Sequence, residues 1–96
     1  MNFNIYYPTP PEYWNPDDDN IDVCIEFENG RQYTVVVITP DNLKFLMEKD
    51  GTRYVEPASP FLIAKRLDME TIEKLITDLV QSGDFFMKAY GGDSEA

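Results

Sequence analysis

Alternating apolar and polar residues predict a β-hairpin in the first half of the chain. Residues 21–28 (IDVCIEFE) place an apolar side chain at nearly every second position, and residues 31–39 are rich in β-branched residues. Between these segments, Asn29 and Gly30 form a dipeptide typical of a two-residue type I′ turn, in which both residues have positive φ. We therefore expect the chain to reverse direction at this point.

A two-residue turn also fixes the register expected for the hairpin. It sets Ile25 opposite Thr34 and Val23 opposite Val36, so that these side chains share one apolar face of the sheet. The same register sends a more polar group of side chains to the second face: Cys24, Glu26, Glu28 and Tyr33.

Two helices are expected after the hairpin. Thr39 has the character of an N-cap and is followed by Pro40, which suits the first helical position, while Gly51 marks the end of this short helix. Asp68 is the expected N-cap of a longer helix that ends at Gly83. This second helix carries an apolar stripe at helical spacing, formed by Ile72, Leu75, Ile76, Leu79 and Val80.

The remaining segments complete an α+β prediction. Residues 2–7 alternate weakly and suggest a short opening strand, and residues 61–64 (FLIA) suggest another. The order of elements predicts an antiparallel sheet of three to five strands with two helices packed on one face. The proline-rich, aromatic and acidic residues 8–20 are expected to form a loop, and residues 91–96 a flexible polar tail.

Length and composition favour a single domain over residues 1–96. A chain of this length that is 43% hydrophobic can bury one modest core. Cys24 is the only cysteine, which excludes an internal disulfide and fits a reducing compartment. The sequence shows neither a signal-peptide pattern nor an apolar run as long as a membrane span, so we expect a cytoplasmic protein that does not enter membranes.

Negative charge is concentrated at the start of the chain. Residues 1–30 contain seven acidic residues and no lysine or arginine, whereas residues 31–96 contain eleven acids and eight bases. A net charge of −10 opposes binding to nucleic acid and to anionic lipid, and it favours a basic partner. The alternative is that the charge serves only solubility.

The loop of residues 8–20 allows two interpretations. Residues 10–13 read P-P-x-Y, a pattern that WW domains bind as a polyproline II helix. Alternatively, the aromatic residues of this region pack on the second face of the sheet, with one or two left exposed: Tyr6, Tyr7, Tyr13 and Trp14. The three adjacent aspartates that follow repel one another, so we expect that they are not all paired internally.

The sequence offers little catalytic or metal-binding chemistry. It contains no histidine, and Cys24, which is expected to be a buried or half-buried apolar residue, therefore has no imidazole partner. Asp18, Asn20 and Asp22 match the first ligands of a calcium loop, but a valine replaces the glycine that such a loop requires. We therefore expect neither an enzyme, nor a cofactor, nor a metal site.

In size, acidity and element order, the chain resembles the immunity proteins encoded beside bacterial toxins and the phage-encoded protein inhibitors of host nucleases. The resemblance implies tight binding to a basic protein, often one that cleaves nucleic acid. It rests on no signature motif, so it assigns no role to any residue of this sequence.

These observations favour a bacterial inhibitor that binds a basic protein, such as a toxin or a nuclease, and blocks it sterically. The acidic side chains would speed encounter, and Tyr13 and Trp14 would supply the contact area. The alternative is a self-associating structural domain, so both a monomer and a homodimer are considered. The expected partner-binding residues are Tyr13, Trp14, Asp17, Asp18, Asp19, Glu26 and Glu28.

Overall fold

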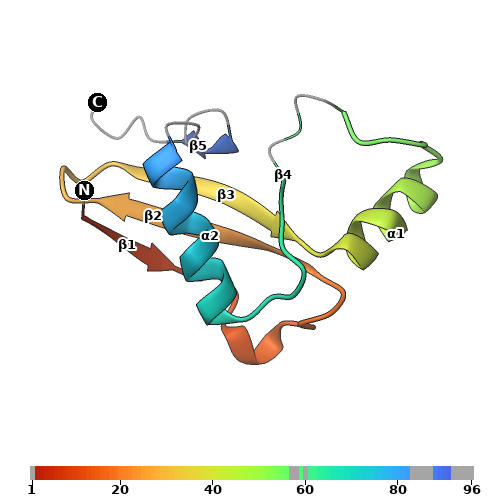
Figure 1. The fold of residues 1–96 in the computed structure, drawn as a ribbon, viewed down its shortest axis with the longest axis horizontal. Helices are drawn as coiled ribbons and strands as arrows, with labels where there is room; N and C mark the ends of the chain where they lie inside the picture. The colour runs from red at the N-terminus through yellow and green to blue at the C-terminus, as the bar shows by residue number, and fades with distance from the viewer. Residues whose placement is uncertain (1, 57–58, 60, 83–87, 92–96) are drawn as a thin grey trace.

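The computed structural model describes residues 2–56, 59, 61–82 and 88–91 (Figure 1). The predicted helix end at Gly83 lies outside these residues. So does the predicted flexible tail, except for Gly91, which belongs to a short strand. The elements in chain order are β1 Phe3–Tyr6, the 3₁₀ turn η1 Pro11–Tyr13, β2 Asn20–Phe27, β3 Gln32–Ile38, α1 Pro40–Asp50, β4 Phe61–Ile63, α2 Met69–Ser82 and β5 Tyr90–Gly91.

The strands form one mixed sheet, which confirms the α+β prediction. Its order is β1-β2-β3-β4. β5 pairs with the start of β3, on the same edge of β3 as β4. All neighbours are antiparallel except β3 and β4, which pair in parallel from Val36 opposite Phe61 to Ile38 opposite Ile63. The parallel pair arises because the chain crosses over through α1 between these two strands.

The hairpin of β2 and β3 exists as predicted, but its turn and its register differ. Gly30 N donates to Phe27 O (2.9 Å) and Phe27 N donates to Arg31 O (2.9 Å). Among the described residues only glycines have positive φ, and Gly30 has φ +88°. The connection is therefore a three-residue loop with a type I turn and a bulge at Gly30, and the predicted type I′ turn is wrong.

The additional loop residue shifts the pairing by one position. Ile25 lies opposite Tyr33 and Val23 opposite Val35, where the two-residue turn predicted Thr34 and Val36. Because side chains alternate between faces, the shift moves Tyr33 from the second face to the core. Cys24 stays on the second face, where its Sγ lies 3.9 Å from Thr34 Oγ1.

The core lies between α2 and one face of the sheet (Figure 1). From α2 it receives Ile72, Ile76 and Leu79, which are buried. As predicted, Asp68 caps this helix: Thr71 N donates to Asp68 Oδ1 (2.8 Å), and this hydrogen bond lowers the pKa of Asp68. The sheet contributes alternate side chains of β2 and β3, namely Ile21, Val23, Ile25, Phe27, Tyr33, Val35 and Val37.

The first helix, α1, lies beyond the end of β3 and buries none of its residues fully (Figure 1). Thr39 caps it, because the Thr39 hydroxyl accepts a hydrogen bond from Asn42 N (3.3 Å). Gly51 ends it with φ +74°. The predicted start and stop of this helix are therefore confirmed. Its half-buried apolar residues, Leu43, Leu46 and Met47, border a cavity that is described below.

We expect Gly30→Val to lower the free energy of unfolding by about 1–3 kcal/mol, because a β-branched residue is strained at positive φ. A Cβ added to Gly30 would meet no atom within 4 Å, so the cost comes from the backbone alone. Asn29→Asp is the matched control, since it keeps an acceptor for Arg31 N. Chemical denaturation measures both variants, and a Gly30→Val protein as stable as wild type would rule out the three-residue turn.

Candidate functional site

Residues 15–19 connect η1 to β2 and are called the acidic loop below. Backbone hydrogen bonds attach this loop to two distant parts of the chain. Thr39 N, at the junction of β3 and α1, donates to Asp19 O (3.1 Å), and Leu67 N, just before α2, donates to Pro16 O (2.9 Å). The acidic loop therefore sits between the starts of both helices.

The acidic loop also closes on itself through its first and last residues. Asn15 N donates to Asp19 Oδ2 (3.0 Å), and Asp17 N donates to Asn15 Oδ1 (3.2 Å). A third bond runs from Asp18 N to Asn15 O (3.2 Å). Local side-chain bonds of this kind stabilise a tight turn without helix or sheet, so the loop is ordered although it belongs to neither.

Each of the three aspartates has an internal partner, which corrects the expectation that they cannot all be paired. Arg66 Nη1 donates to Asp17 Oδ1 (3.0 Å), and Asn42 Nδ2 donates to Asp18 Oδ1 (3.0 Å). Asp19 is half-buried and accepts the bond from Asn15 described above. The Asp17 side chain is nevertheless 72% exposed, so its ion pair contributes little to stability and its charge still faces solvent.

Of the two predicted aromatic contact residues, only Tyr13 is exposed. Tyr13 is 71% exposed, whereas Trp14 is 8% exposed and belongs to the core. Trp14 Nε1 donates to Thr9 O (2.8 Å), and its ring meets the ring of Tyr7 edge to face at 5.1 Å. Trp14 and Tyr7 thus pack on the α2 side of the sheet, and not on the second face where we expected them.

Packing of this aromatic pair leaves one polar atom without a partner. The hydroxyl of Tyr7 is buried and forms no hydrogen bond within the described part of the chain. Burial, together with the negative charge of Glu73, raises the pKa of Tyr7. Tyr7 and Trp14 therefore attach the loop to the core, whereas Tyr6 and Tyr13 stay exposed.

The P-P-x-Y segment has a different backbone from the one that WW domains bind. Residues 11–13 form the 3₁₀ turn η1, in which Tyr13 N donates to Pro10 O (2.9 Å). A polyproline II helix has no such internal hydrogen bond. In this conformation the segment does not present a WW ligand.

Glu26 and Glu28 lie away from the acidic loop. Glu26 is half-buried on β2 and accepts hydrogen bonds from Tyr6 Oη (2.9 Å) and Gln32 Nε2 (3.4 Å). The bond to Glu26 raises the pKa of Tyr6. Glu28 is exposed in the hairpin turn.

The predicted site residues therefore separate into two groups at opposite ends of β2. The acidic loop precedes Asn20, the first residue of this strand, and Glu28 follows Phe27, the last. An eight-residue strand spans roughly 23 Å, because each residue advances the chain by about 3.3 Å. Asp17 and Asp18 therefore lie near one end of this strand, and the two glutamates lie near the other.

The described residues do not bring together a group of side chains for metal binding. No three His, Cys, Asp or Glu side chains among them are placed to hold a metal ion. Cys24 is half-buried, as predicted for a small apolar residue. Neither helix in this part of the chain has the length and apolar character needed to cross a bilayer.

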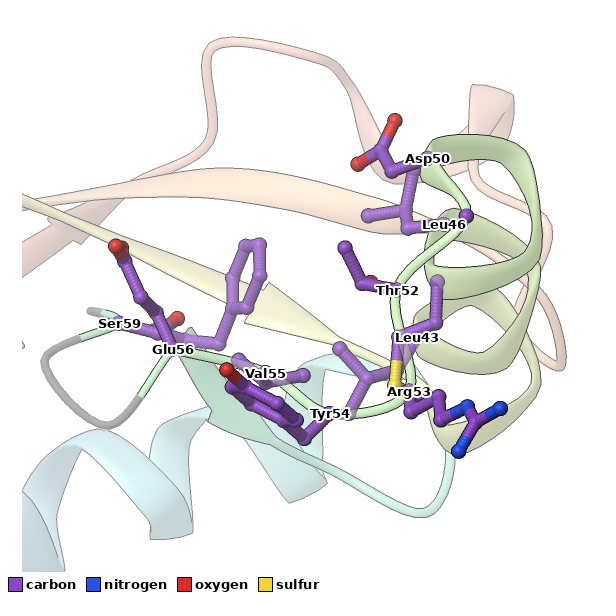
Figure 2. Close-up of a pocket in the computed structure, with 12 residues that line it drawn as sticks. Leu43, Leu46, Asp50, Thr52, Arg53, Tyr54, Val55, Glu56 and Ser59 are labelled. Atoms are coloured by element: carbon purple, nitrogen blue, oxygen red, sulfur yellow. The ribbon is translucent and has the colours of Figure 1, made fainter.

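A cavity of about 820 Å³ lies between α1, the segment that follows it and β4 (Figure 2). Its apolar wall is formed by Leu43, Leu46, Met47, Val55 and Phe61. Apart from Phe61, these side chains come from α1 and from residues 51–56. Tyr54, which is 73% exposed, and Arg53 stand at its border.

The one sequence signal for this cavity is the apolar stripe of α1. Leu43, Leu46 and Met47 recur at helical spacing, which predicts an inward-facing stripe, and in the structure they are only half-buried because they face the cavity. A stripe of three residues on a short helix does not reveal whether it packs against a sheet or lines a cavity. None of the predicted partner-binding residues lines this cavity.

Comparisons with protein family models, with curated proteins and with solved structures find no match for this chain. The resemblance to immunity proteins therefore stays a prediction from size, charge and element order. A function has to be argued from the geometry and charge of the residues themselves.

Trp14→Ala should lower the free energy of unfolding by roughly 3–5 kcal/mol, because it removes a buried ring and leaves a cavity. Tyr13→Ala is the matched control at the adjacent position, and its effect should stay within about 0.5 kcal/mol because Tyr13 is exposed. Urea denaturation measures both. Equal stability of the two variants would show that Trp14 does not belong to the core.

Proposed function

We propose that this protein is an acidic inhibitor that binds a basic protein partner and blocks it sterically, as immunity proteins do. The partner surface would centre on the acidic loop, which immediately precedes β2 in the sequence, and on Tyr13, the last residue of η1. The carrying observation is that the acidic loop is fixed in place by hydrogen bonds to Thr39 and Leu67 before any partner arrives.

Order in the free protein favours binding, because a partner then need not immobilise a flexible loop at the moment of contact. Asp17 and Asp18 are exposed, so their charges can attract a cationic surface over several ångströms. Their bonds to Arg66 and Asn42 hold the carboxylates in defined positions. Such positions suit arginine or lysine side chains of a partner.

Tyr13 supplies the apolar part of the proposed surface. Its ring is exposed although the neighbouring Trp14 is fixed in the core, so its backbone is held while its side chain is free to make contact. Tyrosine is common among the residues that contribute most to protein interfaces. Trp14 is not part of this surface, because its ring is buried. Glu26 and Glu28 would also lie outside the surface.

The proposal includes no chemical step. It is supported by the absence of histidine from the sequence, which leaves no side chain that ordinarily titrates near neutral pH. We also propose a cytoplasmic location and a bacterial toxin or nuclease as the partner. The location is supported by the single cysteine. The partner class is what the resemblance to immunity proteins implies, and the charge of −10 fits a basic protein of that class.

The direct test uses the protein encoded by the adjacent gene and measures its association kinetics with this chain. Asp17→Asn combined with Asp18→Asn should slow association by about tenfold at low salt, and the difference should shrink at high salt. Tyr13→Ala should instead speed dissociation by roughly tenfold or more, because the surface buried in the complex mainly determines how fast the complex dissociates.

The control variant is Glu48→Gln combined with Asp78→Asn, which removes the same charge from exposed positions on α1 and α2. It should leave association nearly unchanged. If both double variants slow association equally, overall charge and not the acidic loop is responsible. If the adjacent gene's product does not bind the wild-type chain, the proposed partner class is wrong.

A further inference from the structure

The outer edge of β1 is an uncharged strand edge that pairs with nothing in the described part of the chain. β1 ends the sheet and pairs only with β2, over four consecutive residue pairs from Phe3 opposite Phe27 to Tyr6 opposite Cys24. Residues 1–11 contain no charged side chain, and Glu12 is the first in the sequence. An edge of this kind offers free backbone donors and acceptors to another strand.

The opposite edge of the sheet is protected against pairing with another strand, whereas β1 lacks such protection. β4 is the other terminal strand, and Lys88 Nζ donates to the carbonyls of Ser59 (3.2 Å) and Phe61 (3.3 Å) at its start. A lysine at a strand edge is one of the devices that prevent unwanted pairing. β1 has no lysine, no proline and no interruption of its register.

The apolar core extends to β1, where its side chains are only partly covered. The rings of Phe3, Phe27 and Tyr33 form a row across β1, β2 and β3, with neighbouring centroids 6.0 and 5.7 Å apart. Phe27 and Tyr33 are buried, but Phe3 and Ile5 of the edge strand are only half-buried. Their exposed parts would be covered by apolar side chains on an added strand.

The lack of charge on β1 indicates which kind of strand fits its outer edge. The residues of β1 carry no charge with which a charged strand could pair directly, whereas an uncharged strand with apolar residues at alternate positions matches them. β1 has this pattern itself. We propose that β1 pairs antiparallel with β1 of a second copy of this chain, about a two-fold axis perpendicular to the sheet, to form a homodimer with one continuous sheet.

The two-fold axis restricts the register of such a pair. Because directly opposite residues share a face, Phe3 must meet an odd-numbered residue of the second copy. Two such registers pair three residues of β1 with its copy, and the one that sets Phe3 opposite Ile5 and Asn4 opposite Asn4 keeps the paired segment farther from Pro8, which cannot donate to a ladder. Phe3 and Ile5 then form an aromatic and β-branched pair on the core side. Asn4 is exposed on the second face, so its own copy can lie beside it without a clash of charges.

This inference does not depend on the proposed inhibitor function, and mass in solution tests it. Two chains of charge −10 repel each other, so the dimer should be weak at about 0.1 M salt and stronger at about 1 M salt, where the repulsion is screened. Sedimentation equilibrium should show the mass rising from 11.1 kDa toward twice that value as protein is concentrated. A mass that stays at 11.1 kDa at about 1 mM protein and about 1 M salt overturns the proposal.

Asn4→Lys should weaken the dimer by roughly fivefold or more, because it brings two lysines together at the axis. Within one chain the new lysine lies opposite Glu26, so the monomer should keep its stability. Gln81→Lys is the control, since it makes the same charge change at an exposed position on α2. It should strengthen the dimer slightly, and equal behaviour of the two variants would exclude β1 as the interface.

A cross-linking experiment tests the register and does not depend on these variants. In a Cys24→Ser background, Asn4→Cys should oxidise to a covalent dimer roughly tenfold faster than Asn2→Cys, because opposite residues in such a pair lie within disulfide range. A dimer by mass in which the two cysteines oxidise equally fast would place the interface elsewhere. The free energy of unfolding is measured for both cysteine variants, and equal values exclude misfolding as the cause of a difference in oxidation rate.

Discussion

The hydroxyl of one buried threonine holds together the parts of this protein that matter for its proposed function. Thr39 is fully buried, and its Oγ1 accepts hydrogen bonds from Asp19 N (3.1 Å) and Asn42 N (3.3 Å) while donating to Asp19 O (3.3 Å). A hydroxyl has one proton and two lone pairs, so all of its bonding capacity is used. At this point β3 ends, α1 begins and the acidic loop is attached, and a loss of the hydroxyl would leave buried donors unpaired.

This arrangement separates the tasks of the aromatic and acidic residues that follow β1. Trp14 and Tyr7 are in or against the core and fix the path of the chain, while Asp17 and Asp18 keep their carboxylates at the surface. The order of the loop therefore comes from backbone bonds, ring packing and the side chains of Thr39, Asn15 and Asp19, and not from the charges of Asp17 and Asp18. Because of this, the charges can be changed without unfolding the loop, and they are free to act on a partner.

Sequence reasoning identified the elements whose signals are local and missed the features that depend on distant residues. The caps at Thr39 and Asp68 and the apolar stripe of α2 were correct because each depends on neighbours within one helix. The turn at Gly30 was located correctly, but one additional loop residue changed the register and the face of Tyr33. The burial of Trp14, the parallel pairing of β4 and the bond between Asp17 and Arg66 join segments far apart in the sequence, where no local pattern gives a signal.

The central claim, that the Thr39 hydroxyl orders the acidic loop and caps α1 together, is tested most directly by amide hydrogen exchange in wild type and Thr39→Val. In wild type the amides of Asp19 and Asn42 should be protected, because each donates to Thr39 Oγ1. In Thr39→Val both should lose protection, and so should the amide of residue 39, because its acceptor Asp19 O belongs to the loop that is no longer held. The amide of Ile72, which bonds to Asp68 O at the start of α2, should keep its protection. Exchange of Asp19 in wild type at the rate of an unfolded peptide would contradict the account.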